Sequence, residues 1–168
     1  MNDIDAIFAL YTEATQQPER SVDSRGNVYY KLNGKKHRED GPAVEVVDGS
    51  KEWYYNGKKH REDGPAVERA NGEKVWWNHG ALHRIGGPAY ICPDGYAGWY
   101  ENDTLHREDG PAIESPSGIN SWAMHGYHFD SPDAWAKALL KYKGKPHDPA
   151  AVQEFLRPIL QKQTKDLI

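Results

Sequence analysis

The stretch His-Arg-Glu-Asp-Gly-Pro-Ala at residues 37–43 returns unchanged at residues 60–66 and 106–112. A degenerate copy at residues 83–89 has Ile85 and Gly86 in place of the two acids. Consecutive copies are therefore 23 residues apart throughout, without insertion or deletion. A strict period of this length is the signature of a repeat protein.

Other positions follow the same period. One series is aromatic and consists of Tyr30, Trp53, Trp76, Trp99 and Trp122. The other consists of Asn33, Asn56, His79, Asn102 and His125. Four full units and the first half of a fifth occupy residues 24–130. The period thus divides the chain into an N-terminal cap at residues 1–23, the repeats, and a C-terminal region at residues 131–168.

Each unit reads as a β-hairpin. Asp-Gly and Asn-Gly pairs are two-residue hairpin signals, because both turn positions take positive φ. Short aromatic runs such as residues 52–55 favour strands, whereas Asp63-Gly64-Pro65 interrupts the next run, since proline cannot donate to a ladder. The sequence predicts a mainly β fold: a meander of stacked hairpins forming one elongated, twisted antiparallel sheet of about 8–10 strands.

The regions on either side of the repeats have helical patterns. Apolar residues at helical spacing predict a helix over about residues 3–14. Ser131-Pro132, an N-cap followed by proline, predicts a helix over residues 133–142, and Asp148-Pro149 predicts a second one over residues 150–163 with a kink at Pro158. We expect the N-terminal helix and the C-terminal helical hairpin to cap the sheet edges or cover one face.

The composition fits a small folded domain with an unusual core. Only 38% of the 168 residues are hydrophobic, yet there are 6 Trp and 10 Tyr, so large rings replace aliphatic layers. The single cysteine, Cys92, excludes an intramolecular disulfide and a cysteine-based zinc site, and makes the cytoplasm the simplest compartment. No apolar run is long enough for a membrane span, and a net charge of −4 gives no general attraction for nucleic acid.

The period, the Asn-Gly-Lys-Lys-His run at residues 56–60 and the aromatic pair before it resemble MORN-type repeats. The His-Arg-Glu-Asp-Gly-Pro-Ala variant resembles the YwqK-type branch, which is common in bacteriophages and bacteria. The resemblance implies a non-catalytic docking scaffold. It also implies a phage-encoded modulator or inhibitor of a bacterial host or defence system, which binds a host protein or complex in the host cytoplasm.

The His-Arg-Glu-Asp tetrad contains the residue types of an active site, but an active site is needed once and this set recurs. We interpret its members as structural: histidines that stack on or hydrogen-bond to the next unit, and aspartates that accept turn N–H groups. The predicted histidine ladder is His37, His60, His83 and His106, and its protonation should make stability depend on pH near 6–6.5. No catalytic residue, metal site or cofactor is predicted.

The aromatic residues form two stripes, because neighbouring residues on a strand point to opposite faces. We interpret Trp53, Trp76, Trp99 and Trp122 as core residues beneath the terminal helices. Helices this short cannot cover both faces of such a sheet, so part of the second stripe should be exposed for binding. The candidate binding residues are Tyr54, Trp77, Tyr100 and, in the irregular third unit, His79 and Tyr90.

Three classes of function remain. The first is a protein-binding scaffold without catalysis. The second is nucleic-acid or nucleotide binding through aromatic stacking and the His-Arg edges. An enzyme is the least favoured class. The irregular third unit fits either a binding surface or sequence drift, and open sheet edges also allow a homodimer.

Overall fold

The computed structural model describes residues 17–143 together with Ile4, Arg157, Pro158 and Gln161. The strands are β1 (Glu19–Val22), β2 (Val28–Leu32), β3 (Lys35–Lys36), β4 (Val44–Glu45), β5 (Lys51–Glu52), β6 (Tyr54–Tyr55), β7 (Lys58–Lys59), β8 (Val67–Glu68), β9 (Lys74–Val75), β10 (Trp77–Asn78), β11 (Ala81–Leu82), β12 (Tyr90–Ile91), β13 (Ala97–Gly98), β14 (Tyr100–Glu101), β15 (Thr104–Leu105), β16 (Ile113–Glu114), β17 (Trp122–Met124) and β18 (Tyr127–Phe129), followed by helix α2 (Pro132–Tyr142).

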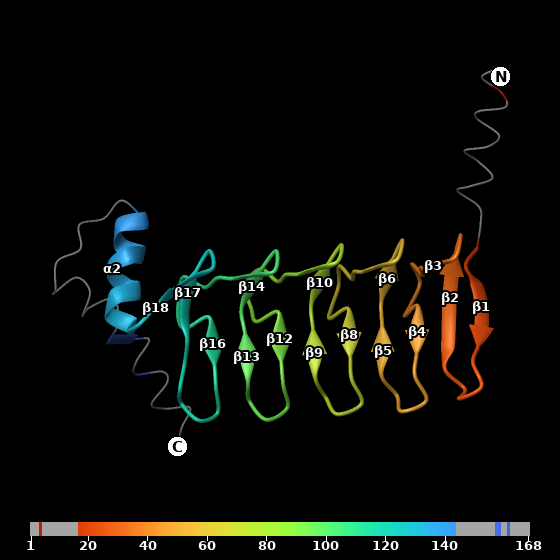
Figure 1. Ribbon diagram of the computed structural model, residues 1–168, viewed down its shortest axis with the longest axis horizontal. Coiled ribbons are helices and arrows are strands. Elements are labelled where there is room, and N and C mark those ends of the chain that lie inside the picture. The colour runs from red at the N-terminus through yellow and green to blue at the C-terminus, as the bar shows by residue number, and fades with distance from the viewer. Residues whose placement is uncertain (1–3, 5–16, 144–156, 159–160, 162–168) are drawn as a thin grey trace.

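The strands form a long antiparallel meander, as the repeat predicts. Ten of them make one sheet in the order β1-β2-β4-β5-β8-β9-β12-β13-β16, with β3 paired to β2. The pairs β6–β7, β10–β11, β14–β15 and β17–β18 are separate two-stranded sheets. Figure 1 shows these hairpins in a row above the long sheet. The prediction of a single sheet was therefore wrong for the hairpins of units two to five.

The strands change partner at the repeated aromatic position. Trp53 donates its backbone N–H to Ala66 across the long sheet (2.8 Å), while its carbonyl accepts from His60 in the hairpin (3.1 Å). The register that pairs Glu52 with Val67 places Tyr54 opposite Pro65, which has no N–H to donate. The ladder cannot continue there, so β6 pairs with β7 instead.

The two kinds of turn differ. At the Asn-Gly turns both residues have positive φ, 48° at Asn56 and 84° at Gly57, as expected for a two-residue hairpin. The Asp-Gly turns are longer: Gly49 has a φ of 93°, Asp48 is not in the positive region, and Val46 N donates to Ser50 O (2.9 Å). A type I turn followed by a left-handed glycine explains this loop.

One face of the long sheet is apolar and the other is charged. Across the strands, cross-strand pairing puts Val44, Glu52, Val67 and Val75 in one row, and all four are buried. The adjacent row is Glu45, Lys51, Glu68 and Lys74, in which opposite charges face each other on neighbouring strands.

The C-terminal end of the sheet is covered by α2. Ser131 caps the helix by accepting from Ala134 N, and Pro132 starts it, so this predicted helix is confirmed. Its apolar side, including Trp135 and Leu139, packs on Trp122 and Met124 in the main hydrophobic cluster. The helix predicted over residues 3–14 lies outside the described residues except for Ile4. The helix predicted over residues 150–163 lies outside them except for Arg157, Pro158 and Gln161.

Candidate functional site

Each repeat arginine stacks on the aromatic residue of its own unit. The guanidinium carbon lies 3.9 Å from the ring centre in the pair Arg38–Tyr30 and 4.0 Å in the pair Arg61–Trp53. The third and fourth units repeat this contact, with Arg84 over Trp76 and Arg107 over Trp99. Arginines, not helices, cover Trp53, Trp76 and Trp99, which are half-buried. The prediction that the terminal helices cover these three residues was therefore wrong. Only Trp122 is buried against a helix, 4.7 Å from the Trp135 ring.

The carboxylates of the tetrad complete the arginine site. Arg61 Nε donates to Asp63 (2.7 Å), and its Nη1 donates to Glu68 on β8 (3.0 Å). This guanidinium lowers the pKa of Asp63 below its usual value. The repeat aspartates were expected to accept turn N–H groups. They accept instead from the arginine side chain, because residue 63 lies two positions after residue 61 on a tight bend.

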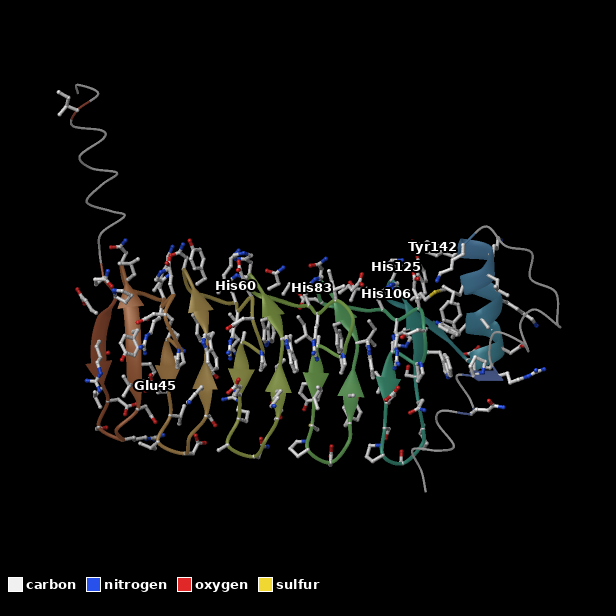
Figure 2. All side chains as sticks on the ribbon, turned by 180° about the vertical axis from the view of Figure 1, so that it is seen from behind. Glu45, His60, His83, His106, His125 and Tyr142 are labelled. Carbon is white, nitrogen blue, oxygen red and sulfur yellow. The ribbon has the colours of Figure 1, made fainter. Side chains whose placement is uncertain are left out.

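The repeat histidines link one unit to the next. Nδ1 of His37 accepts the backbone N–H of Asn56, 19 residues further on (3.0 Å). The other three make the same bond: His60 with His79, His83 with Asn102, and His106 with His125, at 3.2–3.3 Å. Figure 2 shows His60, His83 and His106 in one row along the upper side of the molecule. An Nδ1 that accepts an N–H is necessarily unprotonated.

An aromatic cluster lies where the first two of these links meet. The rings of His60 and His79 are stacked with 3.8 Å between their centres. Tyr55 lies beside them and beside His37, at 6.2, 6.0 and 4.9 Å. Burial, and secondly the charge of His79, lower the pKa of His60.

A groove of about 820 Å³ opens beside this cluster, between residues 37–43 (loop one) and residues 60–66 (loop two). It is lined by residues of both loops and of β6, by Trp53 just before β6 and by His79 in the turn after β10. The lining residues are Arg38, Glu39, Asp40, Gly41, Trp53, Tyr54, Tyr55, His60, Arg61, Glu62, Asp63 and His79. Four carboxylates against two guanidinium groups give the lining a formal charge of −2 with the histidines neutral. The groove therefore suits a cation.

Most of the predicted binding stripe is not free surface. Tyr54, Trp77 and Tyr100 are each half-buried. The Tyr54 hydroxyl donates to Glu52 (2.9 Å), and a Cβ built on Gly98 would lie 2.8 Å from the Tyr100 ring. The Tyr54 and Tyr100 rings thus fold back over the buried row of the long sheet. Burial raises the pKa of both tyrosines.

The other two predicted binding residues, His79 and Tyr90, lie in different places. His79 is exposed and lines the groove, together with Tyr54. Tyr90 lies on β12, where its hydroxyl is 2.9 Å from Cys92 Sγ. This sulfur contact is the main cause of the raised pKa of Tyr90, and burial adds to it. The structure thus brings only two of the five predicted residues to one site.

The sequence analysis missed three residues of the groove. Tyr55 is 40% exposed, and Glu39 and Glu62 are exposed acids next in sequence to Asp40 and Asp63, which bind the repeat arginines. Tyr55 is a tyrosine where the third and fourth units have Asn78 and Glu101. This break in the repeat was the signal that could have identified it.

Within residues 17–143 and the four single residues described, no group of three or more His, Cys, Asp or Glu side chains could hold a metal ion. No helix in the same part of the chain is both long and apolar enough to cross a membrane.

Comparison with known proteins gives no family assignment. No protein-family model matches the chain, and no curated protein matches it.

Proposed function

We propose that this protein is a non-catalytic scaffold that binds another protein along the edge formed by loops one and two. One observation carries the proposal: the histidines and arginines of the repeated tetrad are engaged within the fold, whereas Glu39 and Glu62 of the same loops and the exposed Tyr55 of β6 line an open groove. Groups engaged in every unit hold the repeat together. Groups that are exposed in a groove are available to a partner.

The charge of the groove supports a protein partner over nucleic acid. Glu39, Asp40 and Asp63 have side chains that are 74%, 83% and 82% exposed, and the lining is negative overall even with its two arginines counted, so a phosphate backbone would be repelled there. The sequence resemblance supports a bacterial host protein as the partner of a phage-encoded modulator or inhibitor.

A capture experiment with matched variants tests the proposal. The tagged full-length chain and its Glu39→Lys/Glu62→Lys variant are incubated with nuclease-treated bacterial lysate. The control is Glu19→Lys/Asp130→Lys, which makes the same change of charge at exposed positions near the two ends of the described sheet. Circular dichroism confirms that each variant is folded.

We expect a stoichiometric protein partner that is retained by the control variant and lost with the loop variant. Equal retention by both variants would contradict binding at the loop edge. A partner that is captured from a parallel untreated lysate, is absent from the nuclease-treated one and is salt-sensitive would support nucleic-acid binding instead.

A further inference from the structure

We propose that the groove between loops one and two binds an arginine side chain on an exposed basic segment of the partner protein. This inference rests on the function proposed above and specifies the chemistry that the groove recognises. The chain offers the two components that a guanidinium group needs, an open aromatic face and carboxylates beside it.

The carboxylates come from the first acid of each loop. Within the described part of the chain, neither Glu39 nor Glu62 makes an ion pair with lysine or arginine, although both line the groove. Glu39 lies 3.6 Å from His37 Nε2, which carries no charge unless that ring is protonated. Two carboxylates are thus available in the lining, one from each loop.

The aromatic face comes from Tyr55. Cations lie over the rings of Tyr30, Trp53, Tyr54 and Trp77. Among the described residues, the ring-to-ring contacts of Tyr55 are all with histidines, no lysine or arginine lies over its ring, and the residue is 40% exposed. Within the first two units, it is the exposed ring beside the free acids that no cation covers.

The repeat itself shows how this protein binds arginine. Arg61 lies 4.0 Å above Trp53, with one carboxylate at Nε and another at Nη1. Tyr55 with Glu39 and Glu62 offers the same combination to an arginine from outside. Arginine suits it better than lysine, because a planar guanidinium stacks on a ring and binds two carboxylates at once.

Two further loops occupy the same position in the repeat, loop three at residues 83–89 and loop four at residues 106–112. Loop four shows that the first acid of a loop accepts an incoming cation. Glu108 occupies the position of Glu39 in the repeat, and its Oε2 lies 2.9 Å from Lys143 Nζ at the end of α2. Here a basic residue from outside the repeats reaches the carboxylate. The groove between loops one and two has no such cation among the described residues.

The other units lack parts of this site. In loop three Ile85 stands in place of the first acid, and it is 80% exposed. The positions of Tyr55 in the next two units are Asn78 and Glu101. The groove between loops one and two has both the exposed aromatic ring and the two acids. We therefore expect one arginine site in the repeat region.

The test uses the full-length chain and a short Gly/Ser peptide that carries two arginines. A matched peptide carries citrulline, which keeps the shape but has no charge, and a third carries lysine. Backbone amide shifts in NMR titrations at constant ionic strength locate the site and give Kd. The variants are Glu39→Gln/Glu62→Gln and Tyr55→Ala, and the control variant Glu19→Gln/Asp130→Asn removes the same charge elsewhere.

We expect saturable shifts at Glu39, Tyr55 and Glu62, and about tenfold weaker binding in each groove variant, which corresponds to about 1.4 kcal/mol. The control variant should bind within about twofold of the original chain, and citrulline should not bind. Equal weakening in the control, equal binding of citrulline, or no shifts at the groove would overturn the arginine site. If the loop-edge variant still loses its captured partner in that last case, the scaffold function stands and only this inference fails.

Discussion

The repeat arginine is the residue on which the hairpin units depend most. Arg107 combines an aromatic face at 3.7 Å, hydrogen bonds to Asp109 and Glu114, and a third to the Pro111 carbonyl. These contacts join a strand, a loop and the next strand of the same unit. A planar group with five donors is required, so lysine is a poor substitute.

Two of these arginines form a natural comparison. Arg61 has two carboxylate partners, Asp63 and Glu68. Arg84 also stacks on an aromatic ring, that of Trp76, but the positions equivalent to the two acids are Gly86 and Ile91. We expect Arg61→Lys to lower the free energy of unfolding by about 1–2 kcal/mol and Arg84→Lys by about half as much. Urea denaturation measures both, and equal losses would contradict the role given to the carboxylates.

His60 gives the histidine ladder a dependence on pH. Burial and His79 lower its pKa in the fold, against weaker opposing effects of Glu62 and Asn78. The unfolded chain, with a histidine pKa of about 6.5, then binds the proton more tightly. The contribution of His60 to the free energy of unfolding should therefore be greatest above about pH 6.5. It should decline as pH falls below that value and through the lowered pKa.

A variant separates this residue from the other titrating groups. In His60→Asn the amide oxygen can accept the His79 N–H in place of Nδ1 without titrating. Urea unfolding between about pH 5 and 8 should show a shallower pH dependence for this variant than for the original chain. Identical slopes would mean that His60 does not contribute.

At the scale of the element, the small hairpins are built to dock on the preceding unit. The turn glycine of β6–β7 donates its N–H to Lys36 O (2.7 Å), and that of β10–β11 donates to Lys59 O (2.9 Å). Each hairpin thereby bonds to the one before it. This row of bonds runs parallel to the ladders of the long sheet.

Two glycines of unit two test different parts of this arrangement. Gly57→Ala has space, since the nearest atom to a new Cβ is Lys35 Cβ at 3.5 Å, but a φ of 84° strains it by about 1 kcal/mol. Gly64→Ala would place its Cβ 3.0 Å from the Arg61 guanidinium. Both should lower stability, and only Gly64→Ala should change tryptophan emission, because it moves Arg61 from Trp53. An emission change in Gly57→Ala alone would contradict this assignment.

At the scale of the molecule, the repeats form a linear array in which the strands of each unit pair within that unit and with the adjacent units. Stability in such arrays is approximately a sum of unit and interface terms. The apolar row is covered by rings from the same units, so no unit depends on a distant layer. At the C-terminal end α2 covers the last hairpin, with Trp135 Nε1 donating to Arg107 O (3.2 Å).

Deletion of one period tests this independence. Removing residues 70–92, one full period of 23, joins equivalent positions and should give a folded, less stable chain with cooperative unfolding. Removing residues 70–91 shifts the register by one, which exchanges the apolar and charged rows. That chain should lose its near-ultraviolet circular dichroism. Similar spectra and stabilities for the two deletions would contradict a fold set by register.

The repeats were predictable because their signals are local. Asn-Gly turns, the Gly-Pro bend and the Ser131-Pro132 start of α2 depend on residues close in sequence, and all three appear in the structure. The candidate site was predicted less well. Tyr54 and Tyr55 are adjacent tyrosines, and sequence alternation says that they face opposite ways without saying which one is covered.

The sequence by itself determined the period, the turns and the antiparallel order, since these follow from local backbone preferences and a constant spacing. Only the tertiary structure decided which rings are covered and which acids remain free. Pro65 breaks the ladder opposite Tyr54, the chain turns out of the long sheet, and the Tyr54 ring folds over Glu52 while Tyr55 enters the groove. This choice depends on contacts between strands that are separated in the sequence, which local backbone preferences do not specify.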